Sequence, residues 1–200
     1  GALSQDVLAN KIGVEALLVG AYSLLDGQGS SAGTNNGPWA TSSSNWVYGS
    51  VAGGDAHKGS DPGDQNLITP IEQWNATASN AYLDQLWQQR YDGVQRSNET
   101  LRVMKLAKDI SAADVTRITA EARFLRAYQY SILMDLFGNV PITTEADPVG
   151  FFYPVQKSRA EVFAFVDIKP ILTYNIAKFE FKDFNEALTF FLEPGERVEA

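Results

Sequence analysis

The sequence predicts a mainly α-helical protein built around one antiparallel helix hairpin and a long irregular loop. Apolar residues recur every three or four positions over residues 4–25, 80–106 and 112–137, which is the spacing of one helix face. Only residues 107–111 separate the last two segments, so those helices must pack against each other in opposite directions. Residues 26–79 are rich in Gly, Ser and Asn and are predicted to form a loop region.

Composition excludes several classes of protein. The chain has 200 residues, 44% hydrophobic and 20% charged, which is typical of a folded globular protein. Its 16 Lys and Arg face 24 Asp and Glu, giving a net charge of −8 that argues against nucleic acid and anionic membrane surfaces. Cysteine is absent and His57 is the single histidine, so disulfides, thiolate chemistry and multi-histidine metal sites are excluded. No cofactor is expected.

The first helix is predicted over residues 4–25, with a stripe that includes Val7, Leu8, Val14 and Leu18. It is expected to end where Asp26-Gly27-Gln28-Gly29 begins the loop region.

The second and third helices form the predicted hairpin. The second carries an apolar stripe from Tyr82 to Met104. For the third, the Ser111 hydroxyl is expected to cap the first turn, while Gly138 and Pro141 forbid continuation.

The end of the chain is less regular. Ser158-Arg159-Ala160-Glu161 is a capping box that predicts a short helix, which Pro170 then interrupts. We therefore divide the chain into a helical region, residues 1–165, and a C-terminal segment without an assigned fold, residues 166–200.

Polar residues concentrate in the middle of the loop region. Asp55, His57, Lys58, Asp61 and Asp64 lie on a glycine-rich stretch. The three carboxylates could chelate a hard cation, but their order does not match the calcium-loop pattern, and no metal is predicted. The stretch could also be a solvated loop braced by its own backbone, or it could contact a ligand directly.

Three aromatic residues of the loop region, Trp39, Trp46 and Tyr48, are candidates for binding carbohydrate. Flat rings stack on the apolar faces of sugars, while Asn, Ser and Asp side chains hydrogen-bond hydroxyl groups. The alternative is that these rings pack the loop onto the helical core. With the polar stretch, the candidate ligand-binding residues are Trp39, Trp46, Tyr48, Asp55, His57 and Lys58.

The third helix and its exit, residues 121–142 (EARFLRAYQYSILMDLFGNVPI), closely resemble the signature of the SusD/RagB family of Bacteroidetes surface nutrient-binding lipoproteins. Further likeness lies in Gly20–Leu25, in Val51–Asp64 and in Trp87–Leu101, which contains Tyr91-Asp92-Gly93-Val94 and Asn98. Together these segments cover about residues 4 to 166 in the order of the family.

The resemblance implies a fold of tetratricopeptide-like helix hairpins, in which Asn80–Phe137 is the first pair. Ala122, Leu125 and Tyr128 would pack between helices, and Arg123 and Arg126 would brace carboxylates. The signature would thus be structural rather than catalytic.

The resemblance also implies a function without enzymatic activity. Members of the family bind glycans at the outer-membrane surface and deliver them to a TonB-dependent SusC-like transporter. A lipidated cysteine tethers the precursor to the membrane; this chain holds no cysteine, is less than half the usual length, and is expected to be a fragment.

Two alternatives stay open. The chain could be a helical scaffold of the same complex that binds no sugar itself. It could also be a glycosidase that uses a pair of carboxylates among Asp55, Asp61, Asp64 and Glu72.

Overall fold

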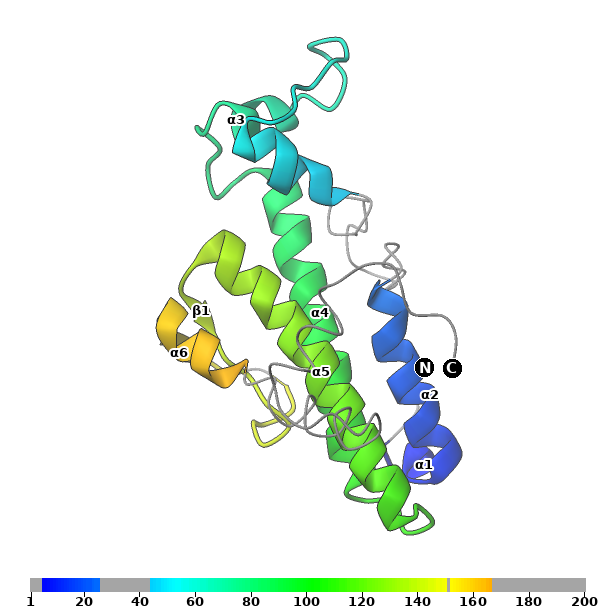
Figure 1. The fold of residues 1–200 in the computed structure, drawn as a ribbon. Helices are drawn as coiled ribbons and strands as arrows, with labels where there is room; N and C mark the ends of the chain where they lie inside the picture. Colours follow the sequence, from blue (N-terminus) through cyan, green and yellow to red (C-terminus); the bar gives the residue numbers. More distant parts are fainter. Residues whose placement is uncertain (1–4, 26–43, 151, 167–200) are drawn as a thin grey trace, which may run out of the picture.

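Two long antiparallel helices form the centre of the molecule (Figure 1). The computed structural model describes residues 5–25, 44–150 and 152–166. Shorter helices pack around the central pair, so the prediction of a mainly helical fold is confirmed. In chain order the described helices are α1 (Gln5–Leu8), α2 (Lys11–Tyr22), η1 (Ser23–Leu25), η4 (Val47–Val51), α3 (Ile68–Glu72), α4 (Ala81–Met104), α5 (Ala112–Phe137) and α6 (Arg159–Phe165).

The central hairpin consists of α4 and α5, and a side-chain cap begins each helix. Asn80 Oδ1 accepts a hydrogen bond of 3.0 Å from the backbone N–H of the second residue of α4. Ser111 Oγ accepts one of 3.1 Å from the third residue of α5. α5 covers the residues expected, 112–137, and ends at Gly138, whose φ of +72° lies in the left-handed region that favours glycine.

The prediction of one continuous helix over residues 4–25 is wrong. The chain forms α1, turns, and begins again as α2, because Asn10 accepts a hydrogen bond of 2.9 Å from the backbone N–H of Gly13 through its side chain. The turn brings Leu8 so close that a β-carbon on Gly13 would lie 2.4 Å from the Leu8 carbonyl oxygen. The side-chain cap and the glycine together explain the break.

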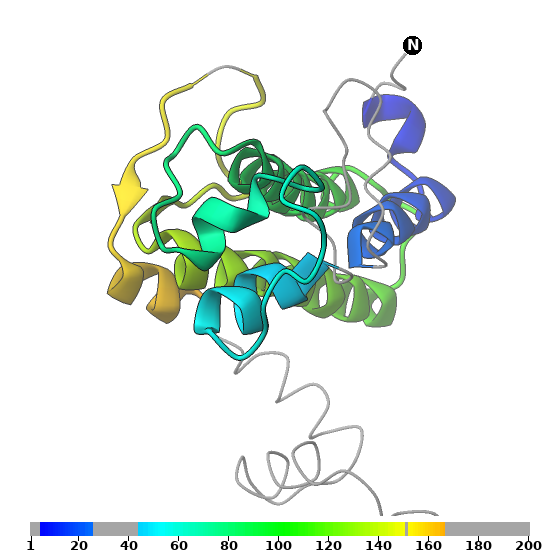
Figure 2. The ribbon, with the colours of Figure 1, turned by 90° about the horizontal axis from the view of Figure 1, so that it is seen from above.

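α2 packs on the hairpin through one apolar face. Val14, Leu18 and Ala21 are buried there against residues of α4 and α5 such as Leu101 and Ile118. Figures 1 and 2 show α2 on one side of the hairpin and α6 on the other. None of the described helices is both long and apolar enough to cross a bilayer.

The prediction of a loop over residues 26–79 is also wrong in part. Residues 26–43 lie outside the described residues, but a helical segment over residues 44–53 contains the π-helix η4, and α3 follows it. Val47 and Val51 bury one face of the first segment, and Ile68 and Ile71 bury one face of the second. The first segment is short and contains Gly and Ser, and α3 has only five residues, so neither periodicity is long enough to stand out in the sequence.

Beyond α5 the chain turns back along the hairpin. Strand β1 (Val140–Pro141) pairs antiparallel with β2 (Gln156–Lys157), and Ser158 and Glu161 form the expected capping box at the start of α6. α6 packs on α5 through Val162, which is fully buried. Residues 167–200 lie outside the described residues.

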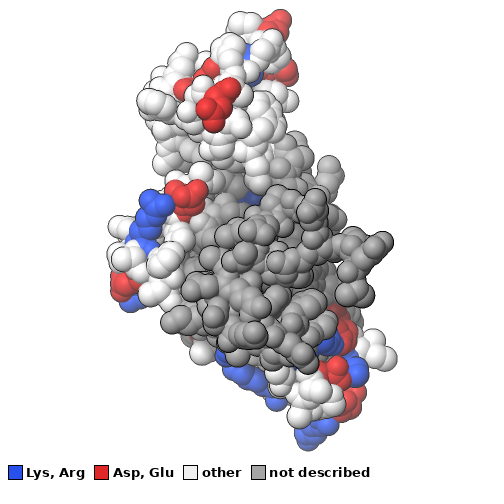
Figure 3. All heavy atoms as spheres, viewed as in Figure 1, with Lys and Arg blue, Asp and Glu red and all other residues white. Residues whose placement is uncertain are grey.

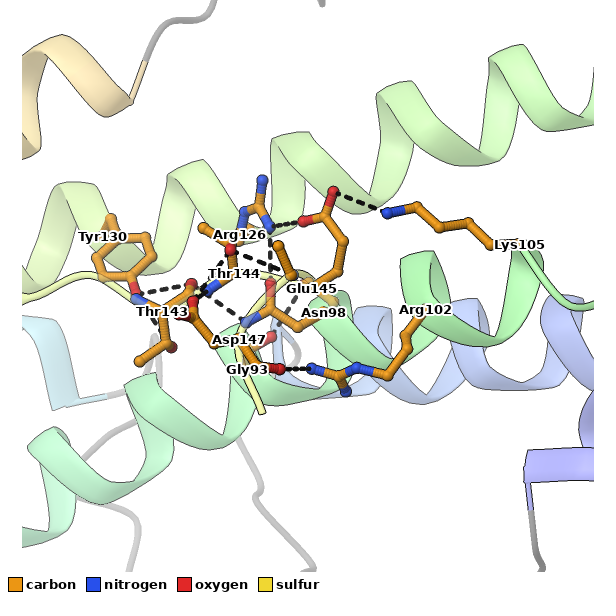
Figure 4. Close-up of polar contacts among 12 residues, drawn as sticks. Gly93, Asn98, Arg102, Lys105, Arg126, Tyr130, Thr143, Thr144, Glu145 and Asp147 are labelled. Atoms are coloured by element: carbon orange, nitrogen blue, oxygen red, sulfur yellow. Dashed lines mark hydrogen bonds and ion pairs between the residues drawn. The ribbon is translucent and has the colours of Figure 1, made fainter. Parts of the chain in front are cut away.

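A buried ion pair joins α5 to the returning chain (Figure 4). Arg126 Nη1 donates to Glu145 Oε2 at 2.6 Å and to Asn98 Oδ1, on α4, at 2.7 Å. Asn98 Nδ2 donates in turn to the Thr143 carbonyl at 3.2 Å. The cluster therefore connects three segments that are distant in the sequence, which is a structural role for the signature residue Arg126.

Other signature residues differ in their surroundings. Ala122 and Leu125 are buried in the core that α2 shares with the hairpin, whereas Tyr128 is only half-buried. Arg123 is exposed and makes no ion pair with any described residue. The expectation that Arg123 braces a carboxylate is wrong for the described part of the chain, because its side chain is exposed and no described carboxylate lies within ion-pair distance of it.

We expect the free energy of unfolding to fall in acid partly through Glu145. Burial would raise the pKa of Glu145, but the hydrogen bond and charge of Arg126, with the charge of Lys105, outweigh it and hold this pKa below its usual range. The pair therefore contributes stability above the pKa of an unfolded glutamate, and that contribution is lost as the pH falls through the lower folded value.

Urea unfolding of wild type and Glu145→Gln across a pH series measures this contribution. The difference in free energy between the two proteins should be largest at neutral pH and shrink below about pH 4. A difference that stays constant into acid would contradict this expectation.

Candidate functional site

Residues 44–80 form a compact unit, here called the cap, at the N-terminal end of α4 (top of Figure 1). Val47, Val51, Ile68 and Ile71 pack with Tyr82 of α4 in a core of their own. Asn80 also ties the cap to the helix, because its Nδ2 donates to the Leu67 carbonyl at 2.9 Å. The cap is thus a folded platform rather than an irregular loop.

The three aromatic residues predicted to bind sugar differ in how far the structure exposes them. Trp46 is 45% exposed, one residue before η4. Tyr48 is half-buried, its hydroxyl donates to the Tyr82 carbonyl at 3.0 Å, and burial raises its pKa above the usual range. Trp39 lies outside the described residues. Of the described pair, Trp46 offers the more accessible ring.

Sequence reasoning missed the most exposed tryptophan of the cap, Trp74. Its side chain is 79% exposed, and its φ of +55° is a left-handed conformation that an aromatic residue rarely adopts. Its Nε1 donates to the Ala52 carbonyl at 2.6 Å, which fixes the orientation of the indole. A signal was present in the sequence: Trp74 stands between Gln73 and Asn75, outside any apolar stripe.

The polar residues of the cap divide into outward and inward side chains. Asp55 and His57 are exposed, and His57 Nδ1 contacts Glu72 Oε1, which joins the loop to α3. Lys58 is only 7% exposed, unlike a residue that reaches out to a ligand.

The Lys58 ammonium group is surrounded by oxygen atoms of its own loop. Nζ donates to the Asp61 carbonyl at 2.8 Å, to the Asp64 carbonyl, and to Ser60 Oγ at 3.4 Å. An ammonium group has three N–H donors, and three acceptors are in place. Lys58 therefore shapes the loop from inside.

The carboxylates proposed as cation ligands are not gathered into a metal site. Asp61 Oδ1 accepts a hydrogen bond of 2.8 Å from the backbone N–H of Gly63. Within the residues that the structure describes, no group of three or more His, Asp or Glu side chains is arranged to hold a metal ion.

The cap is strongly acidic at its surface. Residues 44–80 contain Asp55, Asp61, Asp64 and Glu72 but a single Lys or Arg, Lys58. Figure 3 shows acidic side chains gathered at the end of the molecule that the cap forms.

A pocket of about 640 Å³ lies elsewhere, between the N-terminal helices and α4. Leu8, Ala16 and Leu17 line one side of it, and Gln95 and Glu99 line another. Its lining includes none of the residues predicted to bind sugar. The exposed rings of the cap and this pocket are therefore separate features.

One family model matches most of the chain. It is the model for SusD-like proteins, described as starch-binding and associating with the outer membrane, and it matches residues 28–168. No curated protein matches the chain.

Several solved structures share the fold. Surface glycan-binding protein A from Bacteroides uniformis has a TM-score of 0.68 at 22% identity, and the match covers 84% of this chain and 35% of that protein. Its namesake from Bacteroides fluxus has a TM-score of 0.63 at 23% identity, with 82% and 33% covered. A SusD-like carbohydrate-binding protein from Bacteroides fragilis has a TM-score of 0.59 at 24% identity, with 90% and 34% covered. The chain thus spans about a third of the length of each.

Proposed function

The chain belongs to the SusD-like family, and from this premise we propose that it binds a glycan through the cap and does not cleave it. We further propose that it acts at the surface of the outer membrane, lipid-anchored in its full-length precursor. There it would deliver the glycan to a TonB-dependent SusC-like transporter. The description of the family as starch-binding and outer-membrane-associated supports glycan binding and a location at the outer membrane.

The observation that carries the assignment to the cap is the placement of Trp74. Trp74 combines an exposed aromatic ring with a non-glycine residue in the left-handed region, which adds local strain. Residues held in such backbone conformations cluster at ligand-binding sites. The indole N–H is already bonded to Ala52, so the ring faces are the part of Trp74 offered to a partner.

The chemistry of the surrounding side chains suits a sugar. A ring face stacks on the C–H-rich face of a pyranose, and the carboxylates of Asp55 and Glu72 can accept hydrogen bonds from its hydroxyl groups. Trp46 would provide a second ring. Lys58 supports this surface in our proposal by holding the loop rather than by contacting the ligand.

We expect Trp74→Ala to weaken glycan binding about tenfold, because losing one stacked ring removes on the order of 1 kcal/mol. Isothermal calorimetry against a panel of plant, host and microbial polysaccharides measures the dissociation constants. Trp46→Ala should weaken binding similarly. Trp39→Ala and Tyr48→Ala test the other two aromatic residues that the sequence predicts to bind sugar.

The matched control is Phe163→Ala, which removes an equally exposed ring from α6, outside the cap. If the wild type binds a glycan and the three cap variants at Trp46, Tyr48 and Trp74 bind it equally well, the cap is not the site and the scaffold alternative gains support. Release of reducing sugar from the bound polysaccharide would instead support the glycosidase alternative.

A co-purification experiment tests delivery. The full-length protein is expressed together with a SusC-like transporter, and stable association in detergent is the expected result. Separate elution of the two proteins would contradict this part of the proposal.

A further inference from the structure

The exposed ring of Trp74 lies where two helical segments end. Its Nε1 donates to the Ala52 carbonyl in the last turn of residues 44–53, and its backbone N–H donates to the Ile71 carbonyl in α3. Carbonyl groups in the last turn of a helix carry partial negative charge because they lack intrahelical partners. Both carbonyl groups hold Trp74 in place, and their partial negative charge lies beside the ring.

Two carboxylates stand next to these helix ends. Asp55 follows the first helical segment by two residues, and its Oδ2 lies 3.9 Å from where a β-carbon on Gly53 would be. Glu72 is the last residue of α3, two residues before Trp74. Full negative charges thus add to the partial charges of the carbonyl groups.

The cationic groups of the cap do not offset these charges at its surface. The Lys58 ammonium is buried and directed to carbonyl groups of its own loop. His57 Nδ1 contacts one oxygen of Glu72, Oε1, and histidine is counted as neutral in the net charge of the chain at pH 7. Asp61 and Asp64 add two further carboxylates to the exposed loop, so the surface around the ring carries a clear excess of negative charge.

We infer that the cap selects neutral glycans and rejects glycans that carry carboxylate or sulfate groups, with Asp55 and Glu72 as the specificity-determining residues. This inference rests on the glycan binding proposed above. Carboxylates and carbonyl oxygens accept hydrogen bonds from sugar hydroxyl groups, which are donors. An anionic substituent has no proton to donate there and meets like charges at short range.

Two derivatives of one polysaccharide separate charge from size. Hydroxyethyl starch and carboxymethyl starch at equal degrees of substitution are titrated into the full chain at neutral pH, and a hydroxyethyl and carboxymethyl cellulose pair repeats the comparison. At low ionic strength we expect the neutral derivative to bind at least about tenfold more tightly. The ratio of the two dissociation constants should shrink as salt is added, because salt screens exposed charges.

Charge-removing variants assign the effect to the cap. In Asp55→Asn/Glu72→Gln the ratio between the two derivatives is expected to fall towards one. The matched control, Asp6→Asn/Asp109→Asn, removes two carboxylates near the opposite end of the molecule and should keep the wild-type ratio. Equal binding of both derivatives by the wild type, or an unchanged ratio in the cap variant, would overturn the inference.

The outcomes also separate this inference from the proposed function. Equal binding of the two derivatives, weakened for both by Trp74→Ala, would leave glycan binding by the cap in place and overturn only the selectivity. Absence of binding to every polysaccharide, neutral or charged, would overturn both.

Discussion

Replacing Arg126 with methionine is expected to lower the free energy of unfolding by about 3 to 5 kcal/mol, the usual cost of removing one partner of a buried ion pair. Methionine keeps much of the side-chain volume of Arg126 but leaves Glu145 in a largely buried position with Lys105 as its remaining cation, 3.7 Å away. Asn98 Oδ1 also loses its donor. A largely buried carboxylate that keeps only its longer contact with Lys105 and an unsatisfied acceptor both lower the stability of the folded state.

Urea unfolding followed by circular dichroism measures this loss. Arg123→Met is the matched control, because Arg123 lies three residues earlier on the same helix but is exposed. It should change the free energy of unfolding by less than about 0.5 kcal/mol. Equal stabilities of the two variants would contradict the structural role assigned to Arg126.

The double variant Arg126→Met/Glu145→Met separates the cost of an orphaned charge from the value of the pair. If the main effect of Arg126→Met is to leave Glu145 without its partner, the double variant should recover part of the loss. If the double variant loses as much free energy of unfolding as the two single variants together, the two side chains act independently.

Gly93→Ala is the second substitution with a large expected effect. Gly93 lies where α4 passes α5, and a β-carbon there would lie 2.6 Å from the side-chain Cδ of Gln129, which is fully buried. Gln129 accepts a hydrogen bond of 3.1 Å from buried Arg90, so moving it disturbs a polar contact that water cannot replace. We expect a net loss of about 2 to 3 kcal/mol, after the gain of about 1 kcal/mol from the higher helix propensity of alanine.

Gly20→Ala is the matched control for this substitution. Gly20 is also within a helix, α2, but outside the backbone of that helix no atom of the described residues lies within 4 Å of the position that its β-carbon would take. Its replacement should therefore stabilise the protein by about 0.5 to 1 kcal/mol. Urea unfolding should therefore show that the same change, glycine to alanine, lowers the free energy of unfolding at position 93 and raises it at position 20. A stabilising Gly93→Ala would show that the two helices can separate at little cost.

The hairpin could be predicted from the sequence because its signals are long and redundant. α5 has 26 residues with a continuous apolar stripe, a serine cap before it and a glycine after it. Any one of these signals could be lost and the others would still give the same helix.

The break before α2 and the helices of the cap could not be predicted in this way. At Asn10 a side-chain cap interrupts an apolar pattern that runs on either side of it, so the pattern alone indicates one helix. In the cap, short helical segments bury their faces against each other and against Tyr82 and Leu83 of α4. Their stability comes from contacts distant in the sequence, which periodicity does not report.

The candidate site was predictable in composition but not in geometry. The sequence indicates that aromatic and polar residues gather between residues 39 and 64. It does not show that the Lys58 ammonium turns inward or that Trp74, beyond this stretch, is the ring held out to solvent. Both depend on how α3 folds back on the helical segment before it.

The ammonium group of Lys58 has a consequence for how the acidic loop keeps its shape. Loops whose carbonyl oxygens converge on a dissociable cation change conformation when the concentration of that cation changes. In the cap, the positive charge at the centre of residues 58–64 is covalently tethered, so its effective concentration is fixed and it cannot be diluted or exchanged. The loop therefore carries its own internal cation, and the convergence of its carbonyl groups does not require a dissociable one.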